Sequence, residues 1–238
     1  MTQPIKPARL LLTALLGGVL GGALVTGTTL WLGRDNTRDY LLAHPEVLPE
    51  VVERLKTKES ESALAQAAPQ AQKVWPGAVL GNPAGKTVLV EFMDYACGYC
   101  RASEKDVARL LAANPDLKVV IRQLPILSPQ SAEAAKLALA AAKQGKFAGF
   151  HQAMYAAGRL TPETMAEAAK TAGIDLALAK GQMAEAATQA EIEGNLTLAR
   201  NLGLNGTPSW IAGGQVLGGA VGYEALAKAL GAKALAKN

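Results

Sequence analysis

Cysteine, histidine and aromatic residues are scarce in this chain of 238 residues. It contains two cysteines, two histidines and 5% aromatic residues. A structural zinc ion usually takes four cysteine or histidine ligands, and no second cysteine pair is present to complete such a set. We therefore expect no metal site, and we interpret His44 and His151 as ordinary surface or helix residues. Half of the residues are apolar, so the chain can bury a substantial core.

The sequence also lacks a dense basic run with interleaved aromatic residues. The net charge is +4, but the lysines that contribute to it are scattered, as Lys228, Lys233 and Lys237 are near the C-terminus. Nucleic-acid-binding surfaces usually concentrate their positive charge in patches or stripes. The charge pattern thus indicates a solvated surface and argues against nucleic acid as a partner.

Charge is absent from Leu10 to Gly33, directly after Lys6 and Arg9. As a helix this stretch would extend about 36 Å, enough to cross a bilayer. Basic residues ahead of it favour a cytoplasmic N-terminus, with the rest of the chain exported. We predict that residues 1–33 are an uncleaved signal anchor, and a cleaved signal peptide is the alternative.

Residues 34–73 are predicted to form a helical stalk broken at Pro45 and Pro49. One set of residues gives short amphipathic patterns: Leu41, Leu42, Val47, Leu48, Val51, Val52 and Leu55. This apolar face could pack on the chain's own domain, or it could join copies of the chain through residues 36–56. The sequence leaves these two interpretations open.

A compact domain is predicted over residues 74–238. Its expected strands are 78–80, 87–93, 118–123, 209–212 and 215–217, and its expected helices are 97–113, 129–145, 147–157, 162–173, 175–203 and 223–235. The run TVLVEFM at 87–93 is almost continuously apolar, which is typical of a central strand covered on both faces. A helix between it and the next strand implies a parallel pair. The order is βαβ, then a helical block over about 129–203, then ββα.

The pair Cys97 and Cys100 carries the clearest chemical signal. It directly follows a predicted central strand and opens a helix, the context in which a Cys-x-x-Cys motif is specific. Unsatisfied N–H groups at a helix N-terminus stabilise a thiolate on Cys97, and thiolates are the species that exchange disulfides. A purely structural disulfide is the alternative, but so small a loop gives little entropic stabilisation.

The run LVEFMDYACGYCR and the later GTPSW resemble the DsbA family of the thioredoxin superfamily. More narrowly, QLPIL, VLGGAVGYEAL and the extension DYLLAHPEVL resemble the envelope DsbA-like proteins of the suppressor-of-copper-sensitivity group. The resemblance covers about residues 74–235. It implies an α/β thioredoxin fold with an inserted all-helical subdomain, here preceded by the predicted membrane anchor and helical stalk.

The resemblance also implies roles for individual residues. Cys97 corresponds to the exposed nucleophile and Cys100 to the buried resolving cysteine. Thr207 and Pro208 correspond to a cis-proline loop that lies beside the redox pair and binds substrate backbone.

Three further positions complete the candidate site. Glu91 corresponds to a buried acid beneath the cysteines, and its position inside TVLVEFM supports burial, although an edge-exposed glutamate is the alternative. Gly98 and Tyr99, between the cysteines, are expected to face substrate. They depart from the Pro-His pair of the family's strongest oxidants, which leaves the redox potential open.

The sequence thus predicts a disulfide oxidoreductase or isomerase that acts on cysteine-containing exported proteins and is reset by a membrane redox partner. It would need no cofactor beyond the Cys97–Cys100 disulfide. It is expected at the periplasmic face of the inner membrane, or in the periplasm after signal cleavage. The alternatives are a membrane-tethered chaperone or binding module, and a dedicated reductant in copper handling or cytochrome maturation.

Overall fold

The computed structural model describes residues 37–231, which contacts divide into two compact units, one ending at Lys58 and one beginning at Glu59. The first unit contains a helix over 37–43, a turn at 45–46 and the start of α2 (Val47–Ala71). The predicted break at Pro49 is wrong. Pro49 lies in the first turn of α2, where backbone N–H groups have no partner inside the helix and proline is tolerated.

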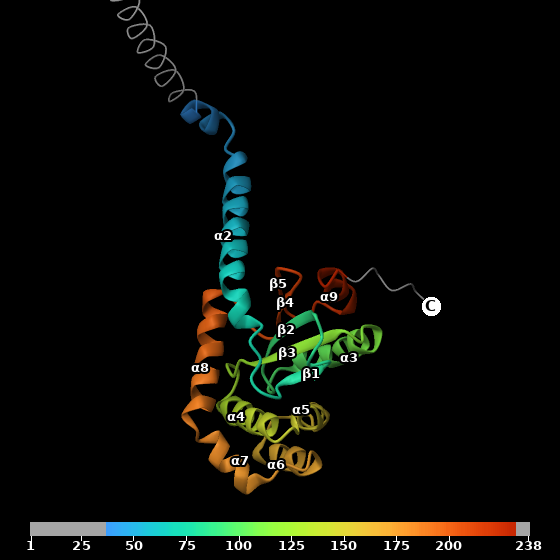
Figure 1. Ribbon diagram of the computed structural model, residues 1–238. Coiled ribbons are helices and arrows are strands. Elements are labelled where there is room, and N and C mark those ends of the chain that lie inside the picture. Colours follow the sequence, from blue (N-terminus) through green and yellow to red (C-terminus); the bar gives the residue numbers. More distant parts are fainter. Residues whose placement is uncertain (1–36, 232–238) are drawn as a thin grey trace, which may run out of the picture. The chain divides into compact units, whose positions relative to one another are not determined.

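A five-stranded mixed sheet forms the centre of the second unit (Figure 1). Its strands are β1 (Val79–Gly81), β2 (Thr87–Met93), β3 (Leu117–Gln123), β4 (Ser209–Ala212) and β5 (Gln215–Gly218), in the spatial order β1-β3-β2-β4-β5. β2 pairs parallel with β3 and antiparallel with β4. As predicted, β2 is the central strand, and all of its residues from Leu89 onwards are buried.

Besides the end of α2, the described part of this unit contains seven helices, which follow β2, β3 or β5 in the chain. They are α3 (Gly98–Ala113), α4 (Pro129–Lys143), α5 (Phe147–Ala156), α6 (Pro162–Thr171), α7 (Leu176–Met183), α8 (Ala186–Asn201) and α9 (Tyr223–Ala229). The helices from α4 to α8 lie between β3 and β4 in sequence, so the predicted helical insertion is present. The thioredoxin-like fold with an inserted helical block is confirmed.

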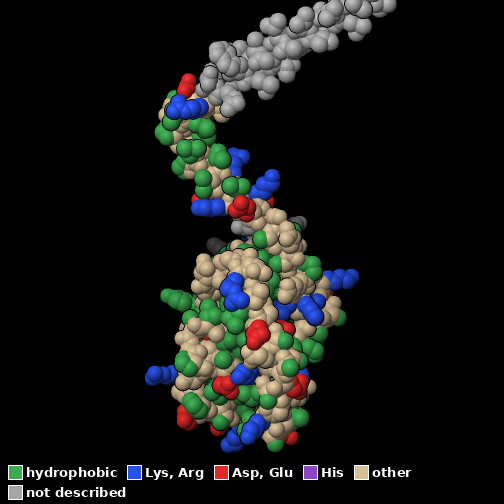
Figure 2. All heavy atoms as spheres, turned by 90° about the vertical axis from the view of Figure 1, so that its left-hand side faces the viewer, with side chains coloured by type: hydrophobic (Ala, Val, Ile, Leu, Met, Phe, Trp, Pro, Cys, Tyr) green, Lys and Arg blue, Asp and Glu red, His purple; other side chains and the backbone are tan. Residues whose placement is uncertain are grey.

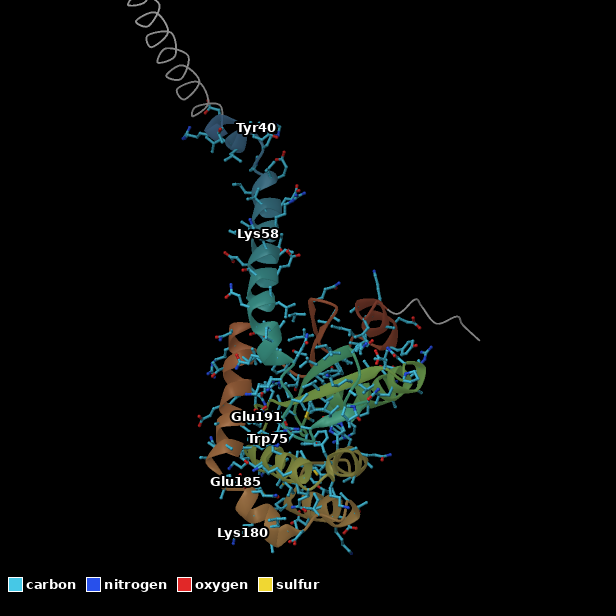
Figure 3. The ribbon with its side chains drawn as sticks, viewed as in Figure 1. Tyr40, Lys58, Trp75, Lys180, Glu185 and Glu191 are labelled. Atoms are coloured by element: carbon cyan, nitrogen blue, oxygen red, sulfur yellow. The ribbon has the colours of Figure 1, made fainter. Side chains whose placement is uncertain are left out.

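The single helix predicted from Asp175 towards Gly203 is wrong, because α7 ends at Met183 and α8 starts at Ala186. Gly181 lies in the last turn of α7, but the link at 184–185 itself contains neither glycine nor proline. Tertiary contacts stabilise it: the Thr188 hydroxyl donates to the Gln182 carbonyl, and Lys143 of α4 forms an ion pair with Glu185. Figure 3 shows Glu185 at the start of α8.

Alternation along β2 directs its side chains to two apolar clusters. Leu89 and Met93 belong to the larger cluster, together with residues of α3, α4, α5 and α9. Val90 and Phe92 point to the other face, where they pack in a cluster with Leu64 of α2. Since strand residues alternate between faces, Glu91 lies on the same face as Leu89 and Met93. That is the face covered by α3.

Arg122 of β3 fixes the end of α2 to the sheet. Its guanidinium group donates to the carboxylate of Glu191 at 2.8 Å and to the Asn195 amide oxygen at 2.9 Å, both on α8. Figure 3 labels Glu191 on that helix. The Arg122 guanidinium group also donates to three backbone carbonyls, those of Gln70, Ala71 and Lys73. Residues 59–73, placed in the stalk by the sequence analysis, therefore contribute to the compact unit.

The segments at the two ends are only partly covered by the structure. The predicted anchor, residues 1–33, lies outside the described residues. Within residues 37–231, no helix combines the length and the apolar character needed to cross a membrane. The final helix, predicted to run from Tyr223 to Leu235, ends at Ala229.

Candidate redox site

Cys97 is the N-cap residue of α3, at the point where the chain leaves β2 and turns into the helix. Its Sγ accepts a hydrogen bond from the backbone N–H of Cys100 at 3.3 Å. A sulfur in this position faces the free N–H groups and the positive end of the helix dipole, which favour a thiolate. The sequence placed Cys97 at this junction, and the structure confirms the placement.

Cys97 is less exposed than its expected role as an exposed nucleophile implied. Only 4% of its surface is accessible. Its thiol donates a hydrogen bond to the Thr207 carbonyl at 3.1 Å, so the loop before β4 lies directly against the sulfur.

Cys100 lies one turn into α3 and has no accessible surface. Burial raises the pKa of its thiol well above the ordinary value, and the charge of Glu91 raises it further. Both cysteines are free thiols in this structure. Cys100 therefore needs a proton acceptor before it can act as a nucleophile.

Thr207 and Pro208 lie directly before β4, and the peptide bond between them is cis, as the family resemblance implied. β4 pairs with β2, so this loop is positioned beside the end of the strand that leads to Cys97. A cavity of about 310 Å³ adjoins the loop and is lined mainly by backbone and small side chains, including Gly206, Thr207 and Gly219. Such a lining suits an extended peptide more than a bulky rigid ligand.

Glu91 is fully buried, so the edge-exposed alternative is excluded. Neither carboxylate oxygen has a hydrogen-bond partner among residues 37–231. Burial raises the pKa of Glu91 well above 4.5, and the charges of Glu104 and Cys97 raise it further. A carboxyl group with a raised pKa and a free lone pair can accept and release a proton during a reaction.

A buried polar chain next to the cysteines was missed by the sequence analysis. The Tyr95 hydroxyl lies 3.1 Å from Nδ1 of His151, and Nε2 of the same ring lies 3.1 Å from a carboxylate oxygen of Glu104. His151 lies in helix α5, as one of its two interpretations had it, but it is 1% exposed, so the surface interpretation is wrong. Tyr95 and His151 are far apart in the chain and share no motif, so no local pattern could have paired them.

The turn between β2 and Cys97 is fixed by Asp94. Its carboxylate accepts hydrogen bonds from the N–H groups of Ala96, Ile126 and Leu127, at 2.8, 2.9 and 2.9 Å. Its own carbonyl accepts from the Cys97 N–H at 2.9 Å. The first cysteine is thus held in place by backbone contacts from the loop after β3.

Gly98 and Tyr99 are both exposed, and Tyr99 is 71% accessible. Ile126 and Leu127, whose N–H groups bind Asp94, also present exposed apolar side chains. The surface around the redox pair therefore offers apolar contacts and no charged side chain inside the motif.

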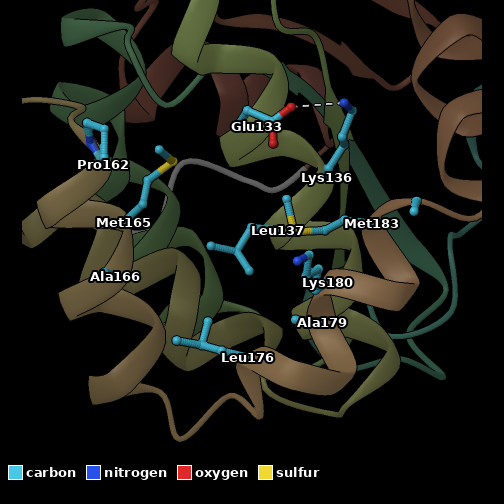
Figure 4. Close-up of a pocket in the computed structure, with 11 residues that line it drawn as sticks. Glu133, Lys136, Leu137, Pro162, Met165, Ala166, Leu176, Ala179, Lys180 and Met183 are labelled. Atoms are coloured by element: carbon cyan, nitrogen blue, oxygen red, sulfur yellow. Dashed lines mark hydrogen bonds and ion pairs between the residues drawn. The ribbon is translucent and has the colours of Figure 1, made fainter.

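The other prominent cavity lies in the helical insertion, between α4, α6 and α7. It measures about 580 Å³. Figure 4 shows Leu137, Met165 and Met183 around it, with Glu133 and Lys136 paired at its edge. None of the candidate site residues lines it.

Comparisons with known proteins cover the part of the chain that carries this site. The family model described as Thioredoxin matches residues 73–232. A second family model, the copper resistance protein ScsC N-terminal domain, matches residues 37–61. The first match spans the sheet, the insertion and every candidate site residue, whereas the second spans the segment with the exposed apolar face.

Solved structures similar to this chain share its fold and chemistry. A thioredoxin-like oxidoreductase from Silicibacter pomeroyi DSS-3 is 36% identical with a TM-score of 0.61, covering 64% of this chain and 89% of that one. The catalytic domain of Proteus mirabilis ScsC is 28% identical with a TM-score of 0.64, covering 72% and 96%. The thiol-disulfide exchange protein alpha-DsbA2 from Wolbachia pipientis is 28% identical with a TM-score of 0.67, covering 74% and 97%.

Curated relatives include a protein described as Na(+)/H(+) antiporter NhaA 3 from Salinispora tropica. It is 29% identical over 155 residues, which make up 64% of this chain and 24% of that protein. The matched part of this chain therefore corresponds to about a quarter of the relative's length.

Proposed function

Because the chain belongs to the thioredoxin family of disulfide oxidoreductases, we propose that it exchanges disulfides with cysteine-containing proteins exported to the cell envelope, through Cys97 and Cys100. The observation that supports this most directly is the position of the Cys97 sulfur. It lies between the Cys100 N–H at 3.3 Å and the Thr207 carbonyl at 3.1 Å. A helix terminus thereby stabilises its thiolate while a substrate-facing loop borders it.

In the oxidising direction, the cycle starts from a disulfide between Cys97 and Cys100. A client thiolate attacks the sulfur of Cys97, forming a mixed disulfide and releasing Cys100 as a thiolate that takes up a proton. A second client thiolate then attacks the client sulfur of the mixed disulfide. The client leaves with a disulfide, and Cys97 leaves as a thiolate stabilised by α3.

Glu91 has the properties of a proton carrier for Cys100. In the reducing or isomerising direction, Cys100 must lose its proton to attack the mixed disulfide, and burial raises its pKa. Glu91 is buried with a raised pKa and unpaired oxygens, so it can take that proton when deprotonated. Gly98, Tyr99, Thr207 and Pro208 would contact the client chain beside the reacting sulfurs.

The N-terminal segment bears on whether oxidation or isomerisation dominates. Most of its apolar residues are exposed, among them Leu42 at 64%, Leu55 at 54% and Val51 at 51%. Figure 2 shows hydrophobic side chains along this segment, interrupted by acidic and basic ones. Exposed apolar faces of this kind usually mark a contact surface. We infer self-association through residues 36–56, which would hold paired active sites around a client and favour isomerisation.

The proposed location is the periplasmic face of the inner membrane. It is supported by the uncharged run from Leu10 to Gly33 behind Lys6 and Arg9. Signal cleavage would instead give a soluble periplasmic protein. A membrane redox partner would reset the cysteines in either case.

The assignment of Cys97 and Cys100 is tested by alkylation and trapping. In the reduced protein at pH 7, iodoacetamide should label Cys97 at least about tenfold faster than Cys100, because thiolate fraction and access both favour it. Cys100→Ser should accumulate mixed disulfides with a model client peptide through Cys97, since the resolving thiol is gone. Mass spectrometry of the labelled and trapped species gives both results.

A second variant and two assays separate the enzyme from a binding module. Cys97→Ser should abolish insulin reduction and scrambled-ribonuclease refolding, and Ser103→Ala on α3 is the control that leaves both cysteines in place. Equal labelling of the two cysteines would contradict the assigned roles. A chaperone that suppresses aggregation equally well without Cys97 would support the binding-module alternative.

A further inference from the structure

His151 joins the redox turn to the helix that follows it. Tyr95 lies two residues before Cys97, in the turn, and Glu104 lies within α3. The His151 ring bonds to both, at 3.1 Å on each side, and comes from α5 in the helical insertion. A single side chain of the insertion therefore bridges the segments on either side of Cys97.

The hydrogen-bond donors in this bridge follow from the chemistry of its ends. An ionised Glu104 only accepts, so Nε2–H of His151 donates to it. In the neutral ring Nδ1 then accepts, and the Tyr95 hydroxyl donates to it. This tautomer satisfies all three side chains at once, although Tyr95 and His151 are almost completely buried.

The bridge is packed so that it cannot easily rearrange. The His151 ring contacts the rings of Tyr95, Phe147 and Tyr155, with centroids 5.7, 5.5 and 5.0 Å away. Tyr155, also on α5, donates a hydrogen bond to the Asp94 carbonyl at 3.4 Å, and that carbonyl accepts from the Cys97 N–H. α5 thus contacts the redox turn at two points.

We propose that His151 is a positioning residue for the redox reaction. It holds the turn that carries Cys97 in a fixed position relative to the N-terminus of α3. This inference rests on the proposed function of Cys97. The helical insertion is then part of the catalytic architecture and not merely a client-facing addition. Holding the sulfur against the helix N-terminus keeps its thiolate stable and keeps the disulfide easy to reduce.

The groups that face His151 set the direction of the expected effect. They are Tyr95 from the turn, Glu104 from α3 and Tyr155 from the same helix as His151. The charge of Glu91 acts on Tyr95 in turn. Removing the ring leaves the Glu104 carboxylate without its Nε2–H donor and frees the turn. Both changes disfavour a thiolate on Cys97.

The test compares His151→Leu with His151→Gln in the full chain. Leucine keeps the volume and breaks both bonds, so Cys97 alkylation should slow by about three- to tenfold at pH 7. Its pH profile should move to higher pH, and the redox equilibrium with glutathione should shift towards the disulfide by a similar factor. Glutamine can accept from Tyr95 and donate to Glu104, so it should recover most of the wild-type values.

Three further variants keep the outcome decisive. Tyr95→Phe removes only the turn side of the bridge and should give part of the leucine effect, even if His151→Leu folds poorly. Gln152→Leu, at an exposed position of the same helix α5, is the matched control and should change nothing. Glu104→Gln keeps an acceptor for Nε2–H but removes the charge, so it should move the pH profile to lower pH.

Two results would overturn the inference. One is a wild-type potential and pH profile in both His151→Leu and Tyr95→Phe. The other is a loss in His151→Gln as large as in His151→Leu, which would point to packing and not to the bridge. If wild-type protein itself fails to exchange disulfides, the proposed function fails instead, so the two failures are distinguishable.

Discussion

Glu91 and Cys100 lie together beneath Cys97, and neither has accessible surface. For both groups burial is the largest cause of a raised pKa. Each therefore favours its neutral form in the folded protein, and ionising one makes ionisation of the other harder.

Glu91→Gln should stabilise the protein in a pH-dependent manner. A carboxyl group whose pKa is raised by folding costs no stability while it is protonated in both states. The loss of folding stability begins as pH rises through about 4.5, the pKa of this carboxyl group in the unfolded chain. The loss then grows until the group ionises in the folded protein as well. The variant should thus match wild type near pH 4 and exceed it at pH 8, by about 1–3 kcal/mol.

Denaturant titrations at both pH values measure this difference, and single-turnover release of a mixed disulfide should slow in the same variant. Asp116→Asn, at the exposed end of the loop before β3, serves as the surface-carboxylate control. A gain that is equal at pH 4 and pH 8 would mean that folding does not raise the pKa of Glu91.

Sequence patterns predict those site residues that have a local signature. Cys97 and Cys100 are a motif, and Glu91 stands out as the ionisable residue within an apolar strand. His151 has no such signature, because FAGFHQAMYA is simply an amphipathic helix. Its importance comes from Tyr95 and Glu104, which only the tertiary fold brings to it.

At the scale of elements, the β4–β5 hairpin depends on two consecutive glycines. Gly213 and Gly214 have φ angles of 53° and 75°, in the left-handed region that glycine adopts most readily. A Cβ on Gly213 would lie 1.9 Å from the carbonyl oxygen of Ala229 in α9, whereas one on Gly214 would meet nothing within 4 Å. The hairpin and α9 are therefore in direct backbone proximity.

Gly213→Ala should destabilise the protein more than Gly214→Ala does. Gly214→Ala carries only the backbone cost, about 1–2 kcal/mol. Gly213→Ala adds a clash with backbone that must shift, a further cost of about 1–3 kcal/mol. Thermal unfolding of the two variants gives the comparison. Equal melting temperatures would show that α9 can shift to accommodate the added Cβ without a loss of stability.

The strands were easier to predict than the helix ends. β2 matches its predicted bounds because its apolar run is bounded by Lys86 and Asp94. The hairpin matches to within one residue, at the end of β5, because Gly213-Gly214 dictates the turn. The break between α7 and α8 was missed because no proline lies there, and because a Thr188 hydroxyl bond and an ion pair to α4 stabilise it. The helix through Pro49 was missed because a proline stops a helix only beyond its first turn.

For the whole molecule, the position of the unit boundary within α2 gives a truncation test. A chain of residues 34–238 should be oligomeric, and one of residues 59–238 should be a folded monomer with redox activity. A chain of residues 74–238 should be less stable by about 3–5 kcal/mol, because it loses buried Leu64 and three carbonyls bound by Arg122.

Light scattering and denaturant unfolding on the three chains decide both points. A truncated chain of residues 34–238 that is monomeric would refute self-association through residues 36–56. Equal stability at residues 59–238 and 74–238 would show that the Arg122 contacts contribute nothing measurable. Loss of isomerisation with retained dithiol oxidation, on removal of residues 34–58, would link assembly to shuffling.

The contact between Cys97 and the Thr207 carbonyl joins residues 110 positions apart. Because synthesis starts at the N-terminus, both cysteines are made long before the loop that lies against Cys97. Until that loop has folded onto the sheet, the thiol of Cys97 lacks its Thr207 partner. A newly made molecule therefore has the free thiols that the proposed function assigns to a client, and a folded neighbour becomes a candidate oxidant for it.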